Sequence, residues 1–400
     1  EVIDPGLQNP NAGPDFFNAK LKINGILWVG NIEIHAHASD WFRHGHDSDK
    51  VYDSVILHVV GEADGEITRT NGEVIPQLQL TCPEHIRAHY HELCVADQYP
   101  ACYPVLASLP KLTVHSWLTA LQTERLEQKA RLITQRLEHC NNNWEDAFFI
   151  TLARNFGFGL NGDAFETWAG LLPLRAVDKH RNDLFQIEAL FYGLAGLFED
   201  TFLKKEQEDE YSLRLCKEFR YLQRKFEFTR VMDATLWRFL RLRPENFPHI
   251  RLAQLAYLYQ KGDKLFSRLL EAETLSEVRE LLTTRTSAYW ESHYLFGQTS
   301  PHKEKTLGER SKNLIIINTV TPFLYTYGLH KADERMCERA GRFLEELKAE
   351  DNHITRAWSN AGLPVATAAD SQALIQLRKE YCDKRKCLFC RFGYEYLRHE

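Results

Sequence analysis

The pattern of apolar positions changes near residue 110. Between Lys20 and Leu80, apolar and β-branched residues form short runs or alternate with polar ones, which predicts strands at Leu21 to Ile23, Ile26 to His35, Val55 to Val60 and Val74 to Leu80. Asn24-Gly25 and Asn71-Gly72 each supply the pair that a type I′ hairpin turn requires, because both central residues adopt positive φ. We therefore expect a small, mixed or antiparallel sheet domain over residues 1–110.

After Pro110, which follows Leu109 and Tyr103-Pro104, apolar residues recur at helical spacing. The predicted helices include Leu112 to Cys140, Trp144 to Phe156, Ile187 to Phe198, Pro248 to Tyr259, Leu314 to Tyr327 and Ser371 to Tyr381. The fold class is thus α+β, with a sheet domain followed by a large all-α region. We divide that region into a helical domain, 111–330, and a helical C-terminal segment with a cysteine cluster, 331–400.

Composition narrows the class of protein further. With 44% hydrophobic and 26% charged residues, the chain is in the ordinary globular range. Nine cysteines are odd in number and widely spread, which favours a reducing compartment over a disulfide framework. No apolar run approaches the roughly 20 residues that cross a bilayer, and the first residues do not form a signal sequence. We expect a cytoplasmic protein that has no membrane partner.

Acids and histidines gather in the first fifty residues, namely Asp15, Glu33, His35, His37, Asp40, His44, His46, Asp47 and Asp49. If 32–37 is a strand, Glu33, His35 and His37 share one face, and Ile32, Ile34 and Ala36 form the core face. Two H-x-H pairs beside carboxylates indicate a metal or catalytic site. The alternative is that these histidines lie on a solvated sheet face. His58, inside an apolar strand, is expected to be a hydrogen-bonded core residue.

Two sequence features resemble the PD-(D/E)XK nuclease core. They are Gly13-Pro14-Asp15-Phe16 and, after a strand and a hairpin, Gly30-Asn31-Ile32-Glu33-Ile34-His35. The resemblance implies that Asp15 and Glu33 hold Mg²⁺ and that the residue at His35, a lysine in that superfamily, orients the attacking water. Histidine instead of lysine favours Mn²⁺ or Zn²⁺. His37, Lys20 or Lys22 could replace the lysine.

Nearly the whole chain also resembles an uncharacterised bacterial family, a domain of unknown function. The resemblance rests on Gly13-Pro14-Asp15-Phe16, Ile32 to His35, Ser39-Asp40-Trp41, His44-Gly45-His46, Val55 to Val60, Arg243 to Gln254 and the cysteines near the end of the sequence, Cys382, Cys387 and Cys390. Members of that family carry a further segment before the position of Glu1, which implies an N-terminal helix there. The resemblance implies no particular activity.

The closing cysteines Cys382, Cys387 and Cys390 form C-x4-C-x2-C, a spacing that lets thiolates meet one metal. A fourth ligand is needed, and Cys337 is the first choice, with His353 and His399 as alternatives. The site would be structural, holding Zn²⁺ or an iron-sulfur cluster. The alternative is that these are free thiols in a basic tail.

A basic stretch between Ser212 and Arg251 interleaves arginines with aromatics. Arginine pairs with phosphate and aromatics stack on unpaired bases, so Arg220, Arg224, Arg238, Arg241 and Arg243 could bind nucleic acid. The net charge of −6 argues against a protein that coats nucleic acid non-specifically but leaves a local basic groove open. The alternative is an ordinary helical surface with its aromatics in the core.

These features lead to three functional hypotheses. The first is a metal-dependent nuclease that uses Mg²⁺ or Mn²⁺ to cut DNA or RNA, with Asp15, Glu33, His35 and His37 at its site. The second is an inactive scaffold that binds nucleic acid or protein. The third is a zinc hydrolase of a small substrate, with ligands from His35, His37, His44 and His46.

Overall fold

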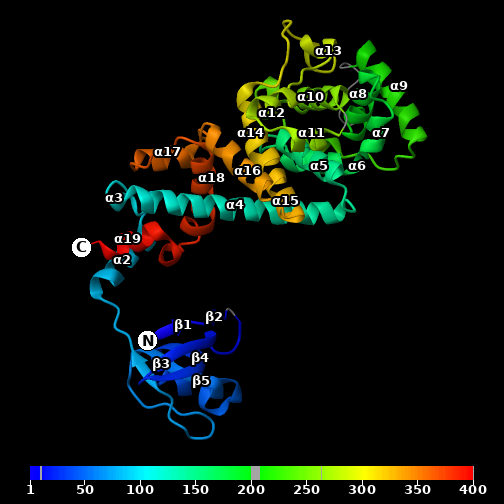
Figure 1. Ribbon diagram of the computed structural model, residues 1–400. Coiled ribbons are helices and arrows are strands. Elements are labelled where there is room, and N and C mark those ends of the chain that lie inside the picture. Colours follow the sequence, from blue (N-terminus) through cyan, green and yellow to red (C-terminus); the bar gives the residue numbers. More distant parts are fainter. Residues whose placement is uncertain (10, 200–207, 263, 400) are drawn as a thin grey trace. The chain divides into compact units, whose positions relative to one another are not determined.

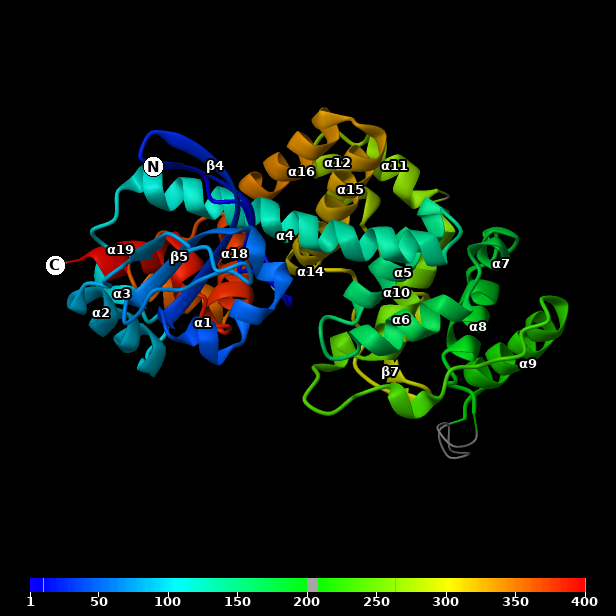
Figure 2. The same ribbon diagram turned by 90° about the horizontal axis from the view of Figure 1, so that it is seen from below.

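The computed structural model describes residues 1–9, 11–199, 208–262 and 264–399. The chain divides into two compact units (Figures 1 and 2). The sheet unit comprises Glu1–Ala101 together with the residues from Gly393 onward, and the helical unit comprises Cys102–Phe392. The α+β class expected from the sequence is confirmed. Within the described ranges, every helix is too short or too polar to cross a lipid bilayer.

The described part of the sheet unit contains one mixed sheet of six strands with the order β1-β3-β4-β5-β6, and β2 pairs with β3 (Figure 1, blue). The antiparallel pairs are β1 with β3, β2 with β3 and β3 with β4, whereas β4, β5 and β6 run parallel. The strands are β1 (Val2–Asp4), β2 (Leu7–Gln8), β3 (Phe16–Ile23), β4 (Ile26–His37), β5 (Val55–Glu62) and β6 (Gln77–Gln79).

The two Asn-Gly pairs form different turns. Asn24 and Gly25 both have positive φ, 51° and 83°, so the β3–β4 hairpin closes with the predicted two-residue turn. At the second pair the prediction is wrong, because only Gly72 has positive φ, 82°. Its amide donates to the carbonyl of Arg69 (2.9 Å), which makes a longer turn whose left-handed position falls on the glycine.

Short helices follow the strands of the sheet unit: α1 (Asp40–Arg43), η1 (His46–Ser48), η2 (Lys50–Ser54) and α2 (Glu84–Val95). The end of the chain contacts α2 through the last helix, α19 (Arg391–Arg398). Tyr396 donates its hydroxyl to Glu92 (2.9 Å), and His89 Nδ1 lies 3.3 Å from the carbonyl of Leu397. The last residues of the sequence thus belong to the first unit.

The helical unit begins with α3 (Tyr103–Leu106) and the 29-residue α4 (Lys111–His139). Its other elements are α5 (Trp144–Phe156), α6 (Gly162–Leu171), α7 (Leu174–Asp178), α8 (Leu184–Leu194), α9 (Glu210–Lys225), η4 (Ala234–Leu236), η5 (Pro244–Asn246), α10 (Pro248–Lys261), α11 (Leu265–Glu271), α12 (Leu275–Leu281), α13 (Ala288–Glu291), β7 (His293–Leu295), β8 (Gln298–Thr299), α14 (Glu309–Ile315), η6 (Ile316–Val320), α15 (Thr321–Lys331), α16 (Glu334–Glu346), α17 (His353–Asn360), α18 (Ala368–Gln376), η7 (Leu377–Cys382) and η8 (Cys387–Phe389).

The predicted helices are recovered with small changes at their ends. Helix α5 has the predicted bounds because the Asn143 side chain caps its first turn, accepting from the amides of Glu145 and Asp146. Two predicted helices contain a π-helical turn, η6 and η7, where the chain widens to a five-residue hydrogen-bond step. Helix α10 is buried on nearly all sides, as its apolar pattern requires, and forms part of one large core.

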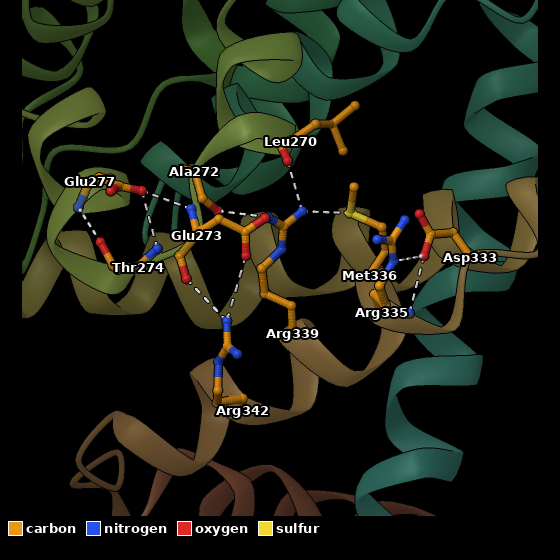
Figure 3. A network of polar contacts seen from close by, with 10 residues as sticks. All are labelled: Leu270, Ala272, Glu273, Thr274, Glu277, Asp333, Arg335, Met336, Arg339 and Arg342. Carbon is orange, nitrogen blue, oxygen red and sulfur yellow. Dashed lines mark hydrogen bonds and ion pairs between the residues drawn. The ribbon is translucent and has the colours of Figure 1, made fainter.

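A buried arginine joins α16 to the connection between α11 and α12 (Figure 3). The side chain of Arg339 is 3% exposed. Its guanidinium donates to the carbonyls of Ala272 (3.0 Å) and Leu270 (2.7 Å) and pairs with Glu273 (2.8 Å). Those carbonyls belong to the end of α11 and the residue after it, so the arginine supplies hydrogen bonds that the helix itself does not provide.

We expect Arg339→Ala to lower the free energy of unfolding of the helical unit by about 2 to 4 kcal/mol, because it leaves buried carbonyls without donors. Arg335→Ala is the matched control. That side chain lies on the same helix but is 89% exposed and pairs with Asp333, so its removal should change stability by less than about 1 kcal/mol. Urea unfolding followed by circular dichroism measures both, and equal losses in the two variants would contradict the assignment.

Candidate metal centre

Two short segments bring four donor side chains together in the sheet unit. Strand β4 carries Glu33 and His35, and the segment after it carries His44 and His46. Gly45 between these histidines has φ 74°, a left-handed conformation that reverses the chain between α1 and η1. The reversal turns both imidazoles toward the strand, so that His44 and His46 face His35.

Buried groups fix this segment against the strand. Asp40 is buried and accepts from the backbone amide of His37 (3.2 Å), which ties α1 to the end of β4. The indole of Trp41 is fully buried and donates to the carbonyl of Thr68 (3.0 Å). The ring of His46 stacks on Tyr52 with 3.7 Å between centroids. The segment that carries the two histidines is therefore held against the strand, with His46 packed and His44 exposed.

The donor atoms are spaced as ligands of one ion. One ligand atom from each of His35, His44 and His46 lies within 4.8 Å of the others. His35 Nε2 is 3.1 Å from His44 Nδ1, and Glu33 Oε1 is 3.5 Å from the Nε2 atoms of both His35 and His46. Four donors about 2.1 Å from a tetrahedral ion are separated by roughly 3.4 Å. The three imidazoles thus fit a single transition-metal ion, and the Glu33 carboxylate lies beside two of them.

A fourth histidine orients the central ligand. His58 on β5 is fully buried, and its Nε2 lies 2.8 Å from His35 Nδ1. If His35 Nδ1 donates in this contact, the lone pair of Nε2 points at the other donors. Metal-bound histidines commonly use their second nitrogen in this way, which fixes both tautomer and ring orientation. The expectation that His58 is a hydrogen-bonded core residue agrees with this contact, but the sequence did not indicate its partner.

Lowered pKa values favour the neutral, metal-binding form of His35, His46 and His58. Burial and the neighbouring imidazoles lower the pKa of His35 to about 4 and that of His58 to about 4. Burial and His44 also lower the pKa of His46. At neutral pH these rings therefore carry no proton that a metal would have to displace.

Glu33 and Asp15 are immediate neighbours. The amide of Asp15 donates to Glu33 Oε2 (3.1 Å), and the Asp15 carboxylate accepts from the amide of Ile34 (2.9 Å). Burial, followed by the charge of Asp15, raises the pKa of Glu33 to about 7. A cation bound beside the buried Glu33 and the half-buried Asp15 would stabilise their charged forms.

The expected division between the two sheet faces is only partly correct, because both faces carry buried clusters. Residues 38–54 pack over the face with Glu33 and His35, and Ile32 packs on the predicted core face with Ala19, Leu21 and Ile56. On the predicted core face Ile32 is buried, but Ile34 is 46% exposed and Ala36 is also exposed. His37 does not join the cluster. Its ring is half-exposed and lies 3.3 Å from Glu62.

The other residues singled out from the sequence belong to the helical unit. Arg220 and Arg224 on α9 and Arg238, Arg241 and Arg243 after η4 are all exposed. Cys382 ends η7, and Cys387 and Cys390 lie in the turn that follows. Cys337 on α16 is not placed with them. The charges that act on its thiol are those of Asp333, Glu334 and Glu338, and its sulfur lies 3.6 Å from the carbonyl of Tyr325.

Residues 1–353 match a family model described as "Protein of unknown function (DUF2851)". The chain belongs to this family. Comparison with curated proteins and with solved structures gives no match. The matched range includes the histidine cluster and the exposed arginines, and it ends before the closing cysteines. The expected membership of a family of unknown function is confirmed, whereas the likeness to the nuclease core remains a prediction.

Proposed function

We propose that the sheet unit is a metal-dependent hydrolase of the nuclease type that acts on nucleic-acid phosphodiesters. The observation that supports it most is the convergence of His35, His44 and His46, whose ligand atoms lie within 4.8 Å of one another, with Glu33 beside His35 and His46. Three nitrogen donors favour Mn²⁺ or Zn²⁺ over Mg²⁺, which prefers oxygen ligands. Asp15, beside Glu33, remains a proposed additional ligand.

The bound ion would supply a water of lowered pKa and a positive charge for a phosphoryl oxygen. The chain would provide the rest. His58 holds the ring of His35 in place, and Glu33 and Asp15 hold negative charge at the site. His44 is the most exposed of the three imidazoles. We therefore place the substrate on the side of His44, where a nucleic-acid strand has access.

We propose that the exposed arginines bind the phosphate backbone. The five guanidiniums are exposed, whereas most of the interleaved aromatics point inward, with Phe219 and Trp237 each 5% exposed. Tyr221 is 57% exposed and is the best placed of them to stack on a base. Arg220→Glu with Arg224→Glu should weaken binding of single-stranded DNA about tenfold or more and flatten its salt dependence. Fluorescence anisotropy at two salt concentrations measures both effects, and unchanged binding would remove the arginines from the proposal.

The activity is tested with the full chain, loaded in turn with Mn²⁺ and Zn²⁺ and mixed with single- and double-stranded DNA and RNA. We expect cleavage that EDTA stops and that Glu33→Ala abolishes. Glu62→Ala is the matched control, because that carboxylate is exposed and contacts His37 outside the cluster. Equal cutting by wild type and Glu33→Ala, or no cutting by metal-loaded wild type, would refute the nuclease proposal.

A zinc hydrolase of a small substrate is the second candidate, and the nitrogen-rich donor set favours it. In this version the ligands are His35, His44 and His46, without His37. Hydrolysis of small phosphate or carboxylate esters by protein that leaves nucleic acid intact would select it. Metal binding without any hydrolysis would select the scaffold hypothesis.

A further inference from the structure

The closing cysteines pack against the start of the helical unit. Tyr381, next to Cys382, meets the ring of Trp117 on α4 edge-on at 5.4 Å and donates its hydroxyl to Glu124 (2.9 Å). Arg391, next to Cys390, donates to the hydroxyl of Ser116 (2.8 Å) and lies over the Trp117 ring. These contacts hold both ends of the cysteine segment beside the first turns of α4.

A fourth cysteine lies at that place. Cys102 occupies the residue before α3, the short helix that precedes α4, and is 8% exposed. Burial raises the pKa of its thiol, and the charges of Cys390, Cys382 and Cys387, which lie near enough to act on it, raise that pKa further. Four cysteines from the two ends of the helical unit therefore lie near one another.

The local backbone presents the closing cysteines in the manner of a metal-binding turn. Cys387 begins the single turn η8, and the amide of Cys390 donates back to the carbonyl of Cys387 (3.2 Å). Arg385, between Cys382 and Cys387, has φ 53° and reverses the chain. Cys390 is 8% exposed, whereas Leu388 and Phe389 between the paired cysteines are 56% and 65% exposed. The turn is therefore not held by burial of its own apolar side chains.

We propose that Cys102, Cys382, Cys387 and Cys390 form a four-thiolate metal centre that joins the first and last segments of the helical unit. Four thiolates are the ligand set of structural zinc sites and of iron-sulfur clusters. The centre is separate from the histidine cluster and does not depend on the proposed hydrolase activity. The fourth ligand in this proposal is Cys102, and not Cys337 as expected from the sequence.

The first experiment compares the full chain with Cys102→Ser and Cys337→Ser, all purified without oxygen. Metal analysis with an acid-labile sulfide assay distinguishes the two sources: iron with sulfide marks a cluster, and zinc without sulfide marks a single ion. All three proteins also carry His44→Ala and His46→Ala, so that the metal analysis counts only the metal bound by cysteines. We expect one centre per chain in this background, its loss with Cys102→Ser and its retention with Cys337→Ser. Full retention with Cys102→Ser, loss with Cys337→Ser, or no thiolate-bound metal would each overturn the proposal.

A second measurement needs no variant. Alkylation of native wild-type protein, read by mass spectrometry, should spare the half-buried Cys382 and Cys387 until a chelator is added, after which both react. The exposed Cys82 should react from the start and serves as the internal control. Equal reaction of Cys382 and Cys387 with and without the chelator would also overturn the proposal, even if Cys102→Ser failed to fold.

Discussion

His35→Ala is expected to weaken Mn²⁺ binding by the full chain more than about 100-fold, because changes in residues that only orient a ligand already cost about 10- to 100-fold. His35 Nε2 lies close to two other donor atoms, His44 Nδ1 at 3.1 Å and Glu33 Oε1 at 3.5 Å. Its removal takes away the centre of the site. Titration followed by the electron paramagnetic resonance signal of free Mn²⁺ measures the change and is little affected by cysteine sites, since Mn²⁺ prefers oxygen and nitrogen ligands.

Two further histidine variants make this prediction specific. His58→Ala should reduce affinity by about 10- to 100-fold, because His58 contacts His35 Nδ1 and acts through its orientation. His37→Ala should leave affinity unchanged, because its ring contacts Glu62 outside the cluster. The expected order is therefore His35 first, His58 second and His37 without effect. A loss with His37→Ala equal to that with His35→Ala would show that strand position, rather than convergence, determines binding.

The sequence predicted part of this site because local periodicity determines it. Alternation along a strand places Glu33 and His35 on one face, and two H-x-H pairs indicate ligands. Which face is covered is a tertiary property. Residues 38–54 pack on the histidine side and bury the polar face, whereas the opposite face buries Ile32 in a second cluster and leaves Ile34 exposed. At the end of β4, His37 pairs with Glu62 at the end of β5, a contact that strand periodicity alone does not reveal.

Contacts between distant segments explain the other differences. The link between His35 and His58 depends on the parallel pairing of β4 with β5, which places Glu33 opposite His58. Cys102 has no local pattern around it and becomes a neighbour of Cys382 only because the end of the chain packs on α4. Helices were predicted more fully, because apolar spacing is a local signal, and the cap of Asn143 that starts α5 is a local contact as well.

Glu33→Gln is expected to have opposite effects on stability with and without metal. In the metal-free protein the pKa of Glu33 is raised from 4.5 to about 7. The folded state therefore binds more protons than the unfolded state between these values, and the free energy of unfolding falls as the pH rises from about 4.5 through 7. Glutamine carries no charge at any pH and can still accept from the amide of Asp15. In EDTA the variant should match wild type near pH 4.5 and be more stable at pH 8 by about 1 to 3 kcal/mol.

With Zn²⁺ at pH 8 the order should reverse, because ionised Glu33 becomes a ligand and binding stabilises only the folded state. Hydrogen exchange of peptides from β4 and β5 reports the sheet unit without interference from the helical unit. Glu62→Gln is the control, since that carboxylate is exposed and should show neither effect. A Glu33→Gln variant that is no more stable than wild type in EDTA at pH 8 would mean that burial does not destabilise the ionised carboxylate of Glu33. A variant stabilised by Zn²⁺ as much as wild type would mean that Glu33 does not bind the ion, so the two halves of the experiment test the electrostatics and the ligand role separately.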